Sequence, residues 1–475
     1  MKIKKLVDKL FQLMKFMCTK MPRRWHFGTN KFQVFNQFIF NKSDLKYINN
    51  MALPIILNNL LAMLMDFCIQ AMVGRLTLNN FAEVSVINTT IYSITGVLGM
   101  VSMAFNILGS RYRGKEDETG LRQSFLVNLF IDFVLGILLF MISILIGKMV
   151  LSELYGFRGA ILDETSIYLN IYVPSIGLNL ILFTFGAYFK IINKTKYTFY
   201  ANLVVTAVNI LMNYILVFGK FGFPRMNMNG AAVAVILSLT LNLIIYLFLI
   251  KCNTIFRAKY DNVFNIFKDT VKITIPLMGQ EVLESTIVII FINSVLSHIG
   301  MKEVSIYNLL FLLISLAYMP MYGYAQTSLT IVSKLFGTEN KDKVKVIPKV
   351  STKLSLIFYI AISGFVVIFN KQILNIITNN NYLITGSMGY LIIALLSSTL
   401  NIPATIYKYC LQGIGDEKWV FLSSILINII NIGLIYIFGI KINMKLNGVY
   451  LGLMINYLIL TVVFSIRYKD KTLCK

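Results

Sequence analysis

Residues 52–74 read ALPIILNNLLAMLMDFCIQAMVG, a run with no basic side chain and with a single acid, Asp66. A helix needs about 20 apolar residues to cross the hydrocarbon core of a bilayer, so this run predicts a transmembrane helix. A carboxylate at that depth costs about 3 kcal/mol and normally faces a protein interior or a water-filled cavity. Asp66 is therefore a candidate for an ion or substrate path.

The rest of the chain has the composition of a membrane protein. Of its 475 residues, 57% are hydrophobic and 14% are charged, and the mean hydropathy is +0.72. Because lipid offers the backbone no hydrogen bonds, we expect an all-α polytopic protein, and the apolar stretches are too continuous for barrel strands. The other eleven predicted spans are residues 82–109, 123–147, 165–190, 197–219, 229–251, 273–297, 304–333, 350–369, 384–411, 418–440 and 447–466.

The basic residues are distributed unequally across these twelve spans. Of the 44 Lys and Arg residues, 35 fall on the side that also holds both termini. Lys and Arg are enriched in cytoplasmic loops, so we expect both termini in the cytoplasm and a location in the cell membrane. This asymmetry accounts for the net charge of +23. We therefore expect the lipid bilayer to be a partner of the protein, and we expect no binding of nucleic acid. Residues 1–49 are basic and rich in aromatics, which fits either a helix lying on anionic lipid or a disordered tail.

An internal repeat relates the two halves of the chain. Pro54 and Pro276 are 222 residues apart, as are Phe199 and Phe421. Each half contains six spans in the same orientation, so the sequence predicts two parallel six-helix repeats that form two lobes. The predicted boundaries are an N-terminal lobe at 50–251, an amphipathic cytoplasmic linker at 252–272, a C-terminal lobe at 273–468 and a cytoplasmic tail at 469–475.

The sequence carries no signature of an enzyme. The two His residues and five scattered Cys residues offer neither a metal-ligand spacing nor a catalytic triad. No phosphate-binding loop of the ATPase type is present, so an ion gradient is the expected energy source. We expect no catalytic activity, no metal and no cofactor.

Four acids lie within the predicted spans and away from their ends: Asp66, Asp132, Glu281 and Glu284. Glu281 and Glu284 are three residues apart and hence on one face of a helix. Neighbouring carboxylates repel, so one of them should hold a proton or share a cation. We take Asp66, Glu281 and Glu284 as candidate ion-coupling residues. In the alternative interpretation, each acid is neutralised by a neighbour and only stabilises packing. For Asp132, both interpretations stay open.

Amide side chains are concentrated in the same spans. Such residues often form hydrogen bonds between membrane helices, and many of them could serve only that purpose. Because they are more numerous than packing requires, we expect some of them to line a cavity. The candidate substrate-cavity residues are Asn58, Gln70, Asn179, Asn209, Gln280 and Asn401.

Several short motifs add a family resemblance. They are Pro54, 72–76 (MVGRL), Asn209, Asn213, 230–235 (GAAVAV), Pro276 and 332–337 (VSKLFG). In this order, and together with the repeat, they make the sequence resemble the multidrug and toxin extrusion (MATE) transporters over residues 50–468. The resemblance implies two lobes around a V-shaped cavity and export of organic, often cationic compounds in exchange for Na+ or H+.

The resemblance also points to a coupling acid in the first helix, and Asp66 is its nearest counterpart. Many relatives have this acid at the position of Ile69, one turn away on the same face. In the second lobe Glu284 falls near a family acid, whereas Asn401 stands about where some members have one. The resemblance therefore leaves the coupling ion open.

Three other classes of protein compete with this interpretation. A lipid-linked oligosaccharide flippase of the same superfamily would share the architecture, although such proteins more often have fourteen spans. A membrane-embedded enzyme or a channel fits less well, because the chain has a repeat and lacks catalytic clusters. We expect a monomer that transports a drug-like or metabolite substrate.

Overall fold

The computed structural model describes residues 42–73, 78–250, 263–338, 341–377 and 380–473. Every regular element in these residues is a helix, and twelve helical segments are long and apolar enough to cross a membrane. The prediction of an all-α protein with twelve spans is therefore confirmed. Most of the predicted basic segment 1–49, and residues 252–262 of the predicted linker, lie outside the described residues.

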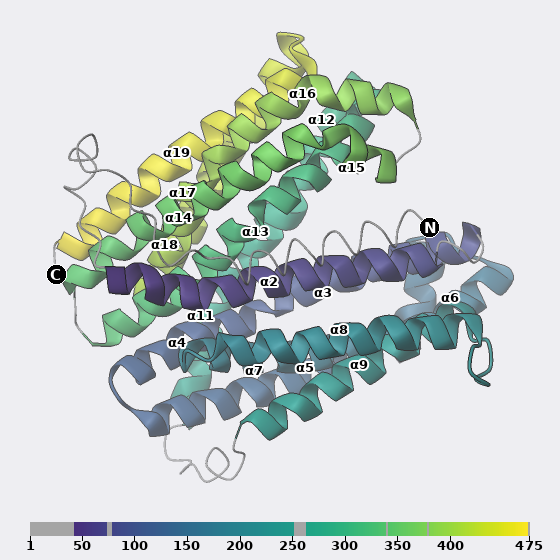
Figure 1. Cartoon of the computed structure of the whole chain (residues 1–475), viewed down its shortest axis with the longest axis horizontal. Coiled ribbons are helices and arrows are strands. Elements are labelled where there is room, and N and C mark those ends of the chain that lie inside the picture. Colours follow the sequence, from purple (N-terminus) through teal and green to yellow (C-terminus); the bar gives the residue numbers. More distant parts are fainter. Residues whose placement is uncertain (1–41, 74–77, 251–262, 339–340, 378–379, 474–475) are drawn as a thin grey trace, which may run out of the picture. The chain divides into compact units, whose positions relative to one another are not determined.

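The first lobe comprises six spans built from eight helices (Figure 1). Four of its spans are single helices of 23 to 36 residues, and two are interrupted by a local break. The helices are α2 (Lys42–Val73), α3 (Leu78–Leu98), α4 (Met100–Gly114), α5 (Glu118–Glu153), α6 (Gly159–Tyr172), α7 (Pro174–Ile191), α8 (Thr195–Phe218) and α9 (Asn227–Leu249).

The second lobe has the other six spans and one short additional helix, α15. Its first span contains a π-helical turn, Leu283–Ile287, and its fifth ends in another, Ile437–Lys441. The helices are α11 (Val263–Val282), α12 (Val288–Ile299), α13 (Met301–Gly337), α14 (Lys341–Ile368), α15 (Asn370–Ile377), α16 (Asn381–Thr399), α17 (Asn401–Ile414), α18 (Glu417–Tyr436) and α19 (Lys445–Leu473).

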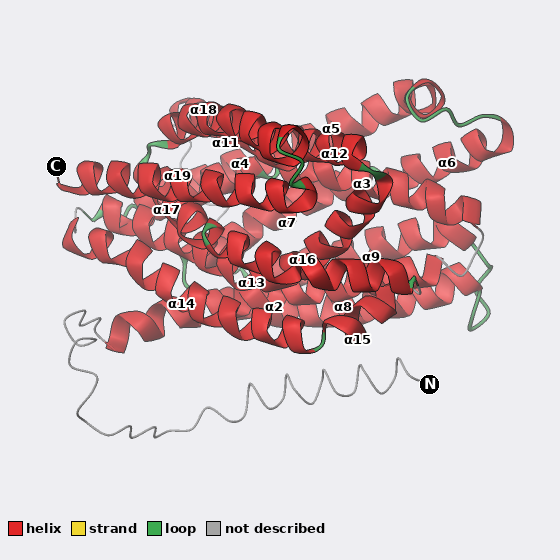
Figure 2. Ribbon diagram, turned by 90° about the horizontal axis from the view of Figure 1, so that it is seen from above, coloured by secondary structure: helices red, strands yellow, loops and turns green. Residues whose placement is uncertain are grey.

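The breaks within the spans have local causes. Pro174 starts α7 immediately after α6, because proline has no backbone N–H to donate to the preceding turn. The π turn Leu283–Ile287 contains Glu284, and such turns occur often at functional sites. Figure 2 shows that the described helices run mostly lengthwise and are joined by loops near their ends.

Aromatic packing forms part of the first-lobe core. Phe105 and Phe125 from neighbouring helices lie with their ring centroids 5.7 Å apart. Phe125 also makes an edge-to-face contact with Phe185 at 5.2 Å, and both rings are almost fully buried. Edge-to-face pairs of this kind add about 1 kcal/mol to the free energy of burial. This cluster holds α4, α5 and α7 together around the space described below.

The two lobes meet at the end of the bundle that carries the basic loops 111–122 and 190–196, here named the basic end. Asn106 of α4 donates to Thr330 Oγ1 of α13 at 3.0 Å, and Arg111 donates to the Gly413 carbonyl at 3.2 Å. Gly114 and Gly337 allow α4 and α13 to approach closely, since a Cβ on either would collide with the other helix's backbone. The lobes are thus in direct contact at the basic end.

Candidate substrate cavity and a buried ion pair

A cavity of about 490 Å³ lies mainly within the first lobe. Small-molecule sites usually have about 300–1,000 Å³, so the cavity is large enough for a drug-sized ligand. Helices α2, α3, α4, α7, α8 and α9 contribute most of its lining. The second lobe contributes Glu281, Gln326, Leu329 and Tyr409.

The cavity wall is rich in amide groups. Asn242 donates to Asn202 Oδ1 at 3.0 Å, and Asn58 donates to Thr198 Oγ1 at 3.2 Å. The other polar atom of Asn58, Oδ1, is buried and has no hydrogen-bond partner within the described part of the chain. The lining amides are Asn58, Asn59, Asn106, Asn179, Asn202, Asn209, Asn242 and Gln326.

The described lining contains two ionisable side chains of opposite charge, Lys190 and Glu281. Lys190 Nζ donates to Gln326 Oε1 at 3.1 Å, so this lysine also connects the two lobes. Within the described residues, no carboxylate forms an ion pair with Lys190, and no basic group forms an ion pair with Glu281. Both charges are therefore available to a ligand.

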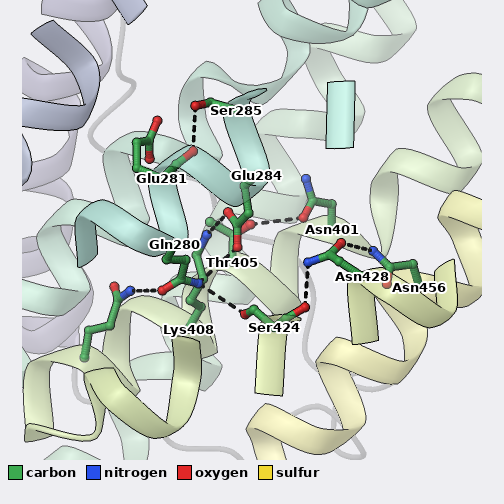
Figure 3. Close-up of polar contacts among 11 residues, drawn as sticks. Gln280, Glu281, Glu284, Ser285, Asn401, Thr405, Lys408, Ser424, Asn428 and Asn456 are labelled. Carbon is green, nitrogen blue, oxygen red and sulfur yellow. Dashed lines mark hydrogen bonds and ion pairs between the residues drawn. The ribbon is translucent and has the colours of Figure 1, made fainter. Parts of the chain in front are cut away.

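The second lobe contains a partly buried ion pair between Lys408 and Glu284 (Figure 3). Lys408 Nζ lies 2.6 Å from Glu284 Oε2, and the two side chains are 14% and 33% exposed. Gln280 donates to the other oxygen of Glu284 at 3.0 Å. Gln412 in turn donates to Gln280 Oε1 at 2.9 Å. These four residues form a continuous polar network between α11, its π turn and α17.

The 222-residue repeat explains why the corresponding part of the first lobe is open. Counting back 222 residues, Glu284 corresponds to Ala62 and Lys408 corresponds to Gly186. Ala62 and Gly186 both line the cavity. A Cβ added to Gly186 would meet no atom within 4 Å. The first lobe thus has two small residues and a cavity where the second lobe has two charged side chains in contact.

The predicted amides differ in where the structure places them. Asn58, Asn179 and Asn209 line the cavity. Gln280 is buried in the network around the ion pair, and Asn401 accepts a hydrogen bond from Thr405 at 3.1 Å. The side chain of Gln70, the sixth candidate, lies outside the described part of the structure.

The predicted acids are also separated. Glu281 faces the cavity, whereas Glu284, three residues later, is held by Lys408. Asp66 lies toward the end of α2 away from the basic end, is exposed, and is not part of the cavity lining.

Asp132 is fully buried between α5 and α7 and does not line the cavity. Thr184 Oγ1 donates to its Oδ2 at 2.7 Å, while Oδ1 has no partner among the described residues. Its position matches the packing interpretation of a membrane acid more closely than a ligand site.

Sequence reasoning missed Lys190 and Lys408, because it examined the acids inside the spans and counted the lysines only for topology. Both lysines fall within or at the end of a predicted span. A lysine so close to the end of a span can reach the membrane interface, so the cost that marked the central acids does not mark these two lysines. Asn202 and Asn242 were missed as well, and only packing distinguishes them from other amides.

A comparison with known proteins identifies the family of this chain. The MatE family model matches residues 54–215 and 276–437, and the 222-residue spacing of the two matches confirms the predicted repeat. One relative is the "Probable multidrug resistance protein NorM" of Thermotoga maritima, 25% identical over 376 residues, which cover 78% of this chain and 80% of the relative. Another is the "Uncharacterized transporter YisQ" of Bacillus subtilis, 21% identical over 410 residues, which cover 84% and 88%.

Solved structures show the same fold. One described as "Outward-facing conformation of a multidrug resistance MATE family transporter of the MOP superfamily" superimposes with a TM-score of 0.82. It is 18% identical in sequence, and the match covers 90% of this chain and 96% of that chain.

Proposed function

The chain belongs to the MatE family of membrane transporters, and on this premise we propose that it exports organic small molecules, often cationic, in exchange for Na+ or H+. The observation that carries the proposal is the amide-lined cavity of about 490 Å³, which has a carboxylate, Glu281, in its wall. Such a cavity offers hydrogen-bonding groups to many ligands and an acid to those that are cationic.

The size of the cavity also bears on the alternative of a lipid-linked oligosaccharide flippase. A volume of about 490 Å³ suits one drug-sized molecule. A lipid carrier with several sugars would need a much longer groove. The relatives named as multidrug resistance proteins favour the same choice.

For coupling, we assign the direct role to Asp66 and Glu281. Neither carboxylate forms an ion pair in the described part of the chain, so each can bind a proton, Na+ or a cationic group of the substrate. Exclusive binding of ion or substrate at one carboxylate would link the two fluxes. Glu284 contributes to this site indirectly, because its ion pair with Lys408 leaves Glu281 as the free acid of the second lobe.

Alternating access would follow from movement of one lobe against the other. The contacts at the basic end, such as Asn106 with Thr330, support a conformation closed on that side. The distribution of Lys and Arg supports a cytoplasmic location for the basic end and for both termini. We further propose that the protein acts as a monomer in the cell membrane, since each chain contains a complete cavity.

The test is export of a cationic dye from proteoliposomes under an imposed Na+ or H+ gradient, normalised to inserted protein. Asp66→Asn keeps the size of the side chain and removes its charge, so it should abolish gradient-driven export. The matched control is Asp132→Asn, a change of the same type at an acid that is fully buried between α5 and α7 and bonded to Thr184, which should retain most of the activity. Export by Asp66→Asn at the wild-type rate would refute the coupling role of Asp66.

A further inference from the structure

We propose that the first-lobe cavity binds a carboxylate group of its substrate through Lys190, so that the protein favours amphoteric molecules over those with positive charge alone. The inference rests on the proposed export function and narrows its substrate class. Lys190 carries it because this lysine lines the cavity without a carboxylate partner.

Lys190 carries a positive charge at the wall of the cavity. An ammonium group has three N–H donors, and the structure shows one of them used, toward Gln326 at 3.1 Å. A charge enclosed by protein is costly unless an opposite charge or several hydrogen bonds compensate it. The cavity gives an anion direct access to Lys190. A carboxylate in that space would supply the missing compensation.

The second lobe differs from the first at the positions that correspond to the cavity. In the second lobe, the protein itself places a carboxylate, Glu284, in the space that corresponds to Ala62. The partner of Glu284 is Lys408, whose counterpart in the first lobe is Gly186. Lys190 follows Gly186 by four residues and therefore lies on the same face of α7, one turn along. Among the described residues, the first lobe thus retains a lysine on this face without a carboxylate in an ion pair with it.

Two other polar side chains of the cavity wall, Asn58 and Glu281, complement Lys190. Asn58 Oδ1 is buried, lies in the cavity wall and lacks a hydrogen-bond donor among the described residues. It can accept from an N–H or O–H group of the substrate. Glu281, on the second-lobe side, can bind a positive group. Together with Lys190, these residues match a molecule that carries both a carboxylate and a basic nitrogen.

Lys190 could instead serve only to connect the lobes through Gln326, and the two roles make different predictions. A connecting role depends on the hydrogen bond, so Gln326→Ala and Lys190→Gln should have the same effect on all ligands. An anion-binding role depends on the charge, so only the lysine variant should discriminate between ligands. Gln is a suitable replacement because Gln412 occupies the equivalent position of the second lobe.

The experiment measures binding of two dyes to the purified full-length protein in lipid nanodiscs by fluorescence anisotropy. Rhodamine 110 has a free carboxylate, and rhodamine 123 is its methyl ester, so the pair differs in the anionic group alone. Wild-type protein should bind rhodamine 110 more tightly. Lys190→Gln should weaken rhodamine 110 binding about tenfold, as expected for loss of a charge-assisted hydrogen bond, and change rhodamine 123 binding much less.

Three further variants serve as controls. Lys190→Arg keeps the charge and should retain the preference for rhodamine 110. Lys196→Gln removes an exposed lysine near the same end that does not line the cavity, and should bind both dyes like the wild type. Gln326→Ala should also retain the preference, since it leaves the charge of Lys190 in place.

Two outcomes would overturn the inference. One is that the wild-type protein binds rhodamine 110 no more tightly than rhodamine 123, or binds neither dye. The other is equal weakening of both dyes by Lys190→Gln, which would assign Lys190 a purely structural role. If binding depends on Lys190 as expected but no gradient drives export of either dye, the proposed function fails and the binding site stands.

Discussion

Replacing Lys408 with Met should destabilise the second lobe far more than loss of a surface ion pair would. The substitution removes the ammonium group that lies 2.6 Å from Glu284 and leaves the carboxylate with one hydrogen bond, from Gln280. Met has nearly the same length as Lys, so the packing of the side chain changes little. The predicted effect is therefore electrostatic.

The magnitude follows from how deeply the pair is buried. Breaking a buried ion pair from one side costs about 3–5 kcal/mol, because the remaining charge is uncompensated. Glu284 is 33% exposed and keeps the bond from Gln280, so we expect about 3 kcal/mol for Lys408→Met, the lower limit of that range. Glu284→Gln should cost a similar amount. The double variant removes both charges and should cost only about 1 kcal/mol.

The assay is a double-mutant cycle on the purified protein, with unfolding in mixed micelles of increasing SDS content followed by helical circular dichroism. The coupling energy between the two sites should be about 5 kcal/mol. The control is the Lys148–Asp163 pair, 62% and 64% exposed, whose single variants should each cost less than about 1 kcal/mol. If the effects of Lys408→Met and Glu284→Gln simply add, the reasoning about this pair is refuted.

Three further predictions concern the cavity, the contact between the lobes and the topology. Gly186→Leu should weaken substrate binding at least about tenfold while leaving unfolding nearly unchanged, because a side chain there extends into open space; wild-type affinity would contradict this. Gly337→Val should destabilise the contact between α13 and the Arg111 carbonyl of α4 by about 1–3 kcal/mol. The distance between spin labels on the two lobes at the basic end, measured by pulsed electron resonance, should increase, and an unchanged distance would contradict the prediction. A cysteine replacing Arg158 should react in whole cells with an impermeant thiol reagent, whereas one replacing Lys341 should not; the reverse pattern would invert the proposed topology.

Sequence alone determined the number of spans and their pairing into two repeats. A span is specified by the length and hydrophobicity of a continuous stretch. Each of the twelve predicted stretches coincides with one helical span of the structure, and their ends differ by at most about ten residues. Pro54 and Pro276 predicted the 222-residue offset that the MatE matches reproduce. These are properties of neighbouring residues, or of a repeated pattern, and do not depend on how the helices pack.

Only the tertiary structure decided which polar residues meet. Glu281 and Glu284 are equivalent by spacing, yet one faces the cavity and the other contacts Lys408, which is 124 residues away in the sequence. The π turn at Leu283–Ile287 departs from the α-helical spacing on which the prediction of one shared face relied. The cavity itself depends on two small residues, Ala62 and Gly186, on different helices. Such open space arises from packing between distant segments, because a small residue creates a cavity only where no neighbour fills the space it leaves.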